Sequence, residues 1–387
     1  MKRVLSIDIT RGLVMIIMAI DHIRDLMHNA SLTLNPLDLS TTTPSIFFTR
    51  WITHLCAPTF VFLSGVSAYL SYKRKNDYKY SRNFLLSRGL WLILLEFTVI
   101  TFAVWWDIHF RFFLFQVIAA IGFGFIILSF LLKLNLRTIL IIGLAIIFSH
   151  DIVSIILSSH PSAMTSVLSP LFNFSVLFPT KNTTLLMGYP IIPWLGIMFT
   201  GFGAGKLFET DIKLRKQYFI KLGIASLLLF ILLRFINIYG DPLPWSVQKN
   251  YVYSFLSFIN VSKYPPSLQY CLLMLGIMFT ILFIVEGFNN KLTEILMVYG
   301  KVPMFYYLMH WYIIHPVMFL ILFIEGFHRK DLFPTANSFG RPVQPNGVSL
   351  LYIYLIWMIV VIFLYPFCKW YGKYKSAHPE NKWLSYL

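Results

Sequence analysis

The sequence predicts an all-α polytopic membrane protein of about ten transmembrane helices, with its N- and C-termini in the cytoplasm. Of the 387 residues, 57% are hydrophobic and only 12% are charged, whereas a soluble globular protein carries about 25% charged residues. The apolar residues come in long runs instead of amphipathic stripes, and most basic residues fall between alternate runs. This composition excludes a soluble enzyme, a disordered chain and a nucleic-acid-binding domain.

Ten stretches are mostly apolar and long enough to cross a hydrocarbon core of about 30 Å, which takes roughly 20 residues per helix. They are 8–27, 51–72, 84–106, 112–132, 137–158, 186–207, 217–238, 267–287, 302–324 and 348–369. Residues 164–178, which Pro170 interrupts, and the proline-rich segment 242–266 are expected to form outer loops, the second lying along the surface. We expect the whole chain, 1–387, to form a single transmembrane domain.

The lysines and arginines set the orientation. With the N-terminus in the cytoplasm and ten crossings, 21 of the 32 basic residues fall on the cytoplasmic side and ten on the outer side, while Arg11 lies within the first span. This bias agrees with the positive-inside rule. Topology therefore explains the net charge of +16 without a nucleic-acid partner. Asp8 and Arg11 interrupt any signal-peptide core, so the first segment is expected to remain as a span, in the inner (plasma) membrane of the cell.

The first span carries an unusual pair of polar residues. Arg11 and His22 are eleven positions apart, which is three helical turns plus roughly 20°, so both side chains share one face about 16 Å apart. Ionisable residues within spans are costly and usually face the protein interior or a wet cavity. The spacing predicts a stripe that links the cytoplasmic side to an imidazole in the outer half of the membrane. The alternative is a charged helix end, with Arg11 snorkelling inward and Asp21, His22 and Asp25 among the headgroups, but this would leave too few apolar residues for a span.

Three further polar residues lie near His22 or within the predicted spans. Asp25 is three positions from His22 and can lie beside it on a helix, where a carboxylate would fix the imidazole tautomer and make the other nitrogen a better base. His54 opens the second span at a similar predicted depth, either as a substrate-orienting residue or as an interfacial histidine. Glu96 lies in the middle of the third span and is expected to pair with an arginine, histidine or hydroxyl of another helix.

No metal site is predicted. His310 and His315 are five positions apart and lie about 140° from each other on a helix, which is poor geometry for one metal ion. The sequence also lacks a His-x-x-x-His pair and a carboxylate-rich ligand pattern.

Several motifs of the chain resemble those of two related acyltransferase families. Arg11, ten intervening residues and His22, in a span that opens Ser-Ile-Asp-x-x-Arg-Gly, are similar to the signature of acyltransferase family 3, whose members O-acylate sugars of the cell envelope. The remaining motifs are closer to bacterial relatives of the heparan-α-glucosaminide N-acetyltransferase catalytic domain. They are Arg3–Asp25, Trp51–Gly65, Tyr189–Trp194, Lys263–Leu268 and Gly300–Tyr307, with the following His310 and His315.

The resemblance implies an acyltransferase that moves an acetyl group from cytosolic acetyl-CoA to an amine or hydroxyl of a sugar at the outer face. The lysosomal member uses an asparagine and a histidine about eleven residues further on. Here Asp21 stands at the asparagine position and Leu32 at the histidine position. The catalytic histidine is therefore expected to be His22 first, and then His28 or His54.

The resulting hypothesis assigns Arg11, Arg74 and Lys75 to the CoA phosphates, by charge complementarity. His22, held by Asp25, would remove the acceptor's proton, with an acyl-imidazole intermediate as the covalent alternative. The partners are acyl-CoA, a sugar or glycan acceptor and the lipid bilayer. The sequence leaves open the acceptor, the acyl chain length and the oligomeric state, a homodimer included.

Two other classes of protein remain as rivals. One is a proton-coupled secondary transporter, in which Asp21, His22, Asp25 and Glu96 form a proton relay. The other is a non-catalytic membrane scaffold. CoA-dependent labelling, as opposed to gradient-driven uptake, separates an acyltransferase from a transporter.

Overall fold

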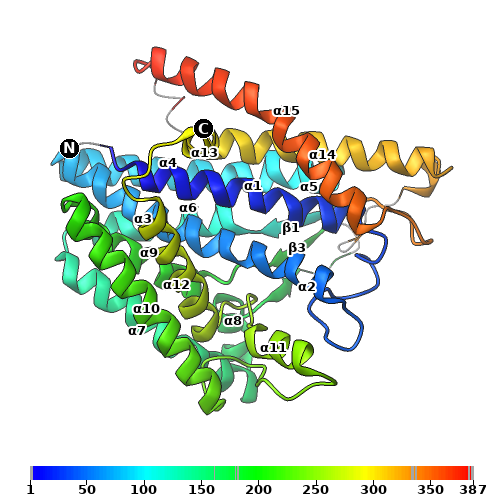
Figure 1. The fold of residues 1–387 in the computed structure, drawn as a ribbon, viewed down its shortest axis with the longest axis horizontal. Coiled ribbons are helices and arrows are strands. Elements are labelled where there is room, and N and C mark those ends of the chain that lie inside the picture. The colour runs from blue at the N-terminus through cyan, green and yellow to red at the C-terminus, as the bar shows by residue number, and fades with distance from the viewer. Residues whose placement is uncertain are drawn as a thin grey trace.

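The computed structural model describes residues 3–160, 162–178, 180, 183–332, 335, 338–381 and 384. Most of them form long helices that pack side by side (Figure 1). The first half contains α1 (Leu5–Met27), α2 (Pro44–Trp51), η1 (Ile52–Leu55), α3 (Cys56–Lys75), α4 (Tyr78–Leu95), η2 (Glu96–Ile100), α5 (Thr101–Trp105), β1 (Phe112–Phe115), α6 (Val117–Leu131), α7 (Leu136–Ser159), α8 (Ala163–Phe172), β2 (Ser175–Leu177) and β3 (Thr184–Met187).

The second half is helical throughout the elements that the structure describes. It contains α9 (Ile191–Gly203), η3 (Ala204–Glu209), α10 (Ile212–Ile236), α11 (Tyr251–Ile259), α12 (Leu268–Val285), α13 (Lys291–Gly300), α14 (Pro303–Ile324), η4 (Arg329–Asp331) and α15 (Leu350–Ala377). Polar side chains start several of these helices by accepting a hydrogen bond from the first turn. Asp211 does so for α10 and Ser267 for α12.

Eight helical segments of the described chain are long and apolar enough to cross a membrane. They are Pro44–Lys75, Tyr78–Trp105, Leu136–Ser159, Ile191–Glu209, Ile212–Ile236, Leu268–Val285, Pro303–Ile324 and Leu350–Ala377. Each coincides with one of the ten predicted spans, which confirms an all-α polytopic membrane protein. The predicted span 8–27 corresponds to α1, which has the length but carries five charged residues.

The predicted span 112–132 is wrong at its start. Residues Phe112–Phe115 form strand β1, and the following helix α6 has only 15 residues. β1 pairs in parallel with β3, and β3 pairs antiparallel with β2, so three short strands make a small sheet. A short apolar run fits a strand as well as a helix, and its partner lies about 70 residues further along the chain.

Two predicted loops contain short helices. Within 164–178, α8 begins at a capping box formed by Ser162 and Thr165, and Pro170 lies in its last turn, shortly before the helix ends at Phe172. Within 242–266, the Asn250 side chain starts α11. This helix exposes Tyr251, whose accessible fraction is 96%, as expected for a segment lying along the surface.

Helix α1 lies in the middle of the bundle and packs against α3, α12, α13, α14 and α15 (Figure 1). Two glycines let α1 and α13 approach closely. A Cβ atom at Gly12 would lie 1.8 Å from the carbonyl oxygen of Leu296, and one at Gly300 would lie 1.8 Å from the carbonyl oxygen of Asp8. Small residues at such crossings allow backbone contact, which drives helix packing in membranes.

The start of α1 and the end of α15 lie on the same side of the molecule, at the left of Figure 1, while α2 lies toward the opposite side. An even number of membrane crossings, as predicted, places both ends of the chain on the same side of the membrane. Lys2, Lys181 and Lys382, which contributed to the predicted charge bias, lie outside the described residues.

The turn after α5 is held by an ion pair. The Asp107 carboxylate accepts two side-chain hydrogen bonds from Arg111, at 2.8 and 3.1 Å, and two more from the backbone N–H groups of His109 and Arg111. Burial acts to raise the pKa of Asp107, but the hydrogen bonds outweigh it and the pKa falls below its ordinary value.

Candidate active site

Both ends of the predicted stripe on α1 face the protein interior. The Arg11 guanidinium donates hydrogen bonds to the carbonyl oxygen of Leu63 at 2.8 Å and to the hydroxyl of Ser67 at 2.7 Å, both on α3. The His22 imidazole faces α14, and its Nδ1 lies 2.7 Å from Nε2 of His310. One helix therefore carries a cation and an imidazole into the bundle.

The His22–His310 contact fixes which nitrogen of His22 is free. Nδ1 of His310 lies 3.2 Å from the carbonyl oxygen of Tyr306, which only accepts, so in a neutral pair His310 donates there and carries its lone pair on Nε2. His22 then donates from Nδ1 to that lone pair. Its Nε2, for which the described residues provide no partner, keeps its own lone pair and is the basic nitrogen.

Aromatic rings enclose the two histidines. Trp311 stacks on His22 with ring centroids 4.3 Å apart, and Tyr306 stacks on His310 at 5.7 Å. Tyr307 meets His22 edge to face at 6.3 Å. Because these rings restrict rotation of both imidazoles, the nitrogen that His22 presents is fixed by packing as well as by hydrogen bonding.

The spacing predicted that Asp25 lies beside His22, but the structure does not bring these two side chains together. The Asp25 carboxylate accepts a hydrogen bond from Arg24 at 2.6 Å, and its side chain is 37% exposed. The guanidinium of the adjacent Arg24 binds the Asp25 carboxylate instead. His310 occupies the position beside His22. Asp21 also pairs with Arg24, at 2.9 Å, and with Arg50 of α2. Asp21 thus joins α1 to α2.

The two alternative histidines lie apart from this pair. His28 directly follows α1 and pairs as a short β-bridge with Val348, and it accepts a hydrogen bond from the backbone N–H of Ala30. Burial, together with the nearby charges of Arg24 and Arg341, lowers its pKa. It lines a separate small hollow with Arg24. The backbone contacts and surroundings of His28 therefore favour a structural role.

His54 is buried at the junction of η1 and α3, and neither ring nitrogen has a hydrogen-bond partner within the described part of the chain. Its ring meets Tyr270 at 5.7 Å, and the Tyr270 hydroxyl donates to the His54 carbonyl oxygen at 2.8 Å. Near Tyr270, the rings of Tyr264 and Tyr189 contact each other with their centroids 5.6 Å apart. The segments 51–65, 189–194 and 263–268, which are far apart in sequence, therefore meet in one region.

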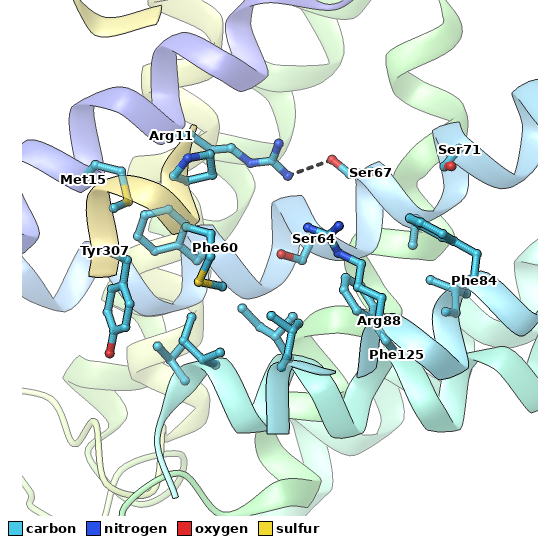
Figure 2. A pocket seen from close by; sticks show the side chains of 18 of the residues that line it. Arg11, Met15, Phe60, Ser64, Ser67, Ser71, Phe84, Arg88, Phe125 and Tyr307 are labelled. Carbon is cyan, nitrogen blue, oxygen red and sulfur yellow. Dashed lines mark hydrogen bonds between the residues drawn. The ribbon is translucent and has the colours of Figure 1, made fainter. Parts of the chain in front are cut away.

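An elongated cavity leads toward the histidine pair from the end of the bundle where α1 begins. We call it the five-helix cavity, because α1, α3, α4, α6 and α14 surround it, and its volume is about 280 Å³. Its lining residues are Arg11, Met15, Met18, Phe60, Ser64, Ser67, Ala68, Ser71, Phe84, Leu85, Arg88, Leu92, Val117, Ile118, Ile121, Phe125, Pro303, Met304 and Tyr307. Figure 2 shows Tyr307 at one end and Ser71, Phe84 and Arg88 toward the other.

The two ends of this cavity differ chemically. Arg11 and Arg88, together with the serines of α3, supply charge and hydroxyl groups toward the start of α1. The other end is apolar except for Tyr307, which belongs to the cavity lining and contacts His22. His22 itself is not a lining residue, so Tyr307 forms the connection between the cavity and the histidine pair.

A second cavity, lined by Arg3, Val4, Ile7, Asp8, Arg11, Ser67, Leu70 and Arg74, adjoins the first. Arg11 and Ser67, which are hydrogen-bonded to each other, line both cavities and form the boundary between them. Of the predicted phosphate ligands, Arg11 and Arg74 line these cavities. Lys75 does not, because its ammonium group lies over the ring of Tyr80 at 5.0 Å.

Glu96 has an unexpected partner. The predicted arginine, histidine or hydroxyl is replaced by the backbone N–H of Ala119, which donates to Oε2 at 2.9 Å in the first turn of α6. Unpaired amides at a helix N-terminus attract a carboxylate, so Glu96 satisfies one of them. Glu96 also begins a π-helical turn, a local irregularity that often marks functional sites.

Three features of the site were not predicted from the sequence: the role of His310, Arg88 as a second basic lining residue, and the row Ser64, Ser67 and Ser71 on α3. The serines recur every three or four residues, a spacing that places them on one helix face. That periodicity was a usable signal. No group of three or more potential metal-binding side chains occurs among the residues that the structure describes.

The half-buried His22 and the buried His310 lie beside a cavity within a bundle of membrane-spanning helices, an arrangement that suits a membrane-embedded enzyme. The chain belongs to the heparan-alpha-glucosaminide N-acetyltransferase catalytic family, whose family model matches residues 3–239. It is accordingly a membrane acyltransferase. No curated protein matches the chain. His310 and Tyr307 lie beyond the matched residues, in the segment that packs against α1.

Proposed function

We propose that this protein transfers an acetyl group from cytosolic acetyl-CoA to an amine or hydroxyl of a sugar at the outer face of the cell membrane. The observation that carries the proposal is the cavity lined by Arg11 and Tyr307, because the Tyr307 ring contacts both His22 and His310. In this proposal residues 1–387 act as one domain, with both termini in the cytoplasm.

The donor would enter at the basic end of the two cavities. Arg11, Arg74 and Arg88 offer guanidinium groups, which bind phosphate oxygens in bidentate fashion. The pantetheine arm would extend along the five-helix cavity, where the hydroxyls of Ser64 and Ser67 can hydrogen-bond its amides and the apolar wall accommodates its methylene groups. The thioester would then lie near Tyr307, beside His22.

His22 would act as the general base through Nε2. The acceptor nitrogen or oxygen forms a bond to the thioester carbonyl carbon and gives its proton to His22, while His310 holds the His22 ring and tautomer. The carbon–sulfur bond then breaks, and the CoA thiolate takes the proton from the His22 imidazolium. The products are the acetylated acceptor and CoA with a free thiol, so no other reactant is needed.

The acceptor would approach from the side of α2. Asp21 and Asp25, held by Arg24 and Arg50, would shape this entrance, and His54 offers two ring nitrogens without partners in the described structure. We assign Asp21, Asp25 and His54 as positioning residues for the acceptor.

The test uses the purified full-length protein in lipid nanodiscs, radiolabelled acetyl-CoA and a panel of glucosaminides. Wild-type protein should transfer label, and His22→Ala should lose most of the transfer while its thermal unfolding stays unchanged. His160→Ala, at an exposed position at the end of α7, is the matched control and should behave as wild type.

Two outcomes would contradict the proposal. One is label transfer at the wild-type rate by the His22→Ala variant. The other is the absence of transfer by the wild-type protein combined with uptake of a solute driven by a proton gradient, which would identify a transporter.

A further inference from the structure

Tyr307 belongs to both parts of the site. It lines the five-helix cavity at the end opposite Arg88 (Figure 2). Its ring also contacts both histidines, with centroid distances of 6.3 Å to His22 and 5.4 Å to His310. A group that reaches His22 along the cavity must therefore pass the side chain of Tyr307.

The buried hydroxyl of Tyr307 makes no hydrogen bond of ordinary geometry to a described residue, and its nearest polar neighbours are the Trp311 indole and the Glu96 carboxyl. A buried hydroxyl without a partner is costly, particularly within a membrane. Buried unsatisfied donors in a folded protein call for an explanation, and a bound ligand is one of them. The position of Tyr307 at the cavity end points to a ligand acceptor atom that arrives with the donor substrate.

We propose that Tyr307 is a catalytic residue that donates its hydroxyl hydrogen bond to the carbonyl oxygen of the thioester. This inference rests on the proposed function. When the acceptor attacks the carbonyl carbon, the π electron pair moves to that oxygen, and the resulting oxyanion is stabilised by the Tyr307 O–H. The oxyanion then re-forms the carbonyl and expels the CoA thiolate, which takes the proton held by His22, so Tyr307 keeps its own proton throughout.

Preorganised donors of this kind stabilise charge that develops only in the transition state, so they raise kcat more than they improve substrate binding. The enclosed surroundings of Tyr307 strengthen the effect, because a hydrogen bond to an anion gains strength when water is excluded.

The neighbouring residue provides a matched comparison. Tyr306 is also buried on α14, also has a hydroxyl without a partner in the described structure, and also contacts His310. It packs against Tyr299 at 5.4 Å and does not line the five-helix cavity. The two tyrosines thus share burial, chemistry and helix, and differ in access to the donor path.

The test compares Tyr307→Phe with Tyr306→Phe in the full-length protein. We expect Tyr307→Phe to lower kcat about 10²-fold, the usual effect of removing one oxyanion donor. The CoA-induced rise in Tm, which reports donor binding and an intact fold, should be unchanged. Tyr306→Phe keeps the ring stacked on His310 and the backbone carbonyl beside it, and it should lower kcat much less than Tyr307→Phe does. Near-wild-type kcat for Tyr307→Phe, or equal losses for both variants, would overturn the assignment.

A second measurement covers the case in which Tyr307→Phe does not fold. Fluorotyrosine at position 307 keeps the ring and the hydroxyl but makes the phenol more acidic. The assignment predicts a larger change in kcat for fluorotyrosine at position 307 than for fluorotyrosine at position 306; equal responses would overturn it. If the wild-type protein transfers no acetyl group, the proposed function fails first, and the role of Tyr307 fails with it.

Discussion

Replacing His310 tests whether the two histidines work as one unit. His310→Phe keeps an aromatic ring but removes the acceptor 2.7 Å from Nδ1 of His22. The His22 imidazole then becomes free to rotate or to adopt the other tautomer, so Nε2 is no longer held as the base. His310→Gln places an amide oxygen on the side chain, which accepts a hydrogen bond, and it is expected to retain more activity than His310→Phe.

The magnitudes follow from the roles of the two rings. General-base catalysis contributes about 10²–10⁴-fold, or about 2.7–5.4 kcal/mol of the barrier, and His22→Ala should lose all of it. His310→Phe should lose about 10²-fold, because it removes only the orientation of that base. If the pair is one unit, the double variant is no slower than His22→Ala, whereas independent residues would multiply the losses to about 10⁴–10⁶-fold.

The assay measures initial rates of radiolabelled acetyl transfer for wild type, the two single variants and the double variant. Each preparation is checked by its thermal unfolding and by its stabilisation with CoA, which separates lost catalysis from lost folding. Losses that multiply in the double variant, or a wild-type rate for a stable His310→Phe protein, would refute the coupling between His22 and His310.

Three further predictions concern the donor path, helix packing and pH. Arg74→Ala should raise the KM for acetyl-CoA roughly tenfold, because a charge-assisted hydrogen bond is worth about 1.5–3 kcal/mol, while Lys75→Ala should leave it unchanged; equal effects in steady-state kinetics would contradict the placement of the path. Gly12→Ala should abolish a monodisperse folded protein, since the added Cβ would lie 1.8 Å from a carbonyl oxygen of α13, whereas Gly372→Ala, with its nearest neighbour at 3.7 Å, should fold normally in size-exclusion chromatography. Asp107→Asn should lower Tm at neutral pH. Because the folded-state pKa of Asp107 is depressed, its stabilisation is present above the unfolded value of about 3.9 and is lost as pH falls through the folded value. The Tm difference from wild type should therefore persist down to about pH 4 and then shrink, and a difference that grew on acidification would have the wrong sign.

The parts of the site that lie on one helix were predictable from the sequence. Helical geometry alone relates Arg11 to His22, and the cost of burying charge in a membrane requires both to face inward. His310 was not predictable in this way, because it lies 288 positions from His22 and no spacing rule connects two helices that pack side by side. The Asp25 prediction failed for a local reason: spacing identifies which side chains can meet, but not that Arg24 binds the carboxylate first.

The fold, like the site, was predictable only in part from the sequence. Long apolar runs predicted the eight helices that are able to span a membrane, because length and composition suffice for that inference. The strand Phe112–Phe115 and the helix Ala163–Phe172 were missed, since short apolar segments acquire their structure from distant partners or from caps. Gly12 and Gly300 are unremarkable in the sequence, and only the packed helices show why they lack side chains.

The central claim is that one continuous path brings the acetyl donor to the histidine pair, and a structure with a bound donor tests it most directly. The full-length protein would be imaged by electron cryo-microscopy with a thioether analogue of acetyl-CoA that cannot transfer its group. We expect phosphate density beside Arg11 and Arg74, the arm within the five-helix cavity, and the carbonyl group between Tyr307 and Nε2 of His22. Density for the analogue at any other surface, with the five-helix cavity empty, would contradict this binding mode.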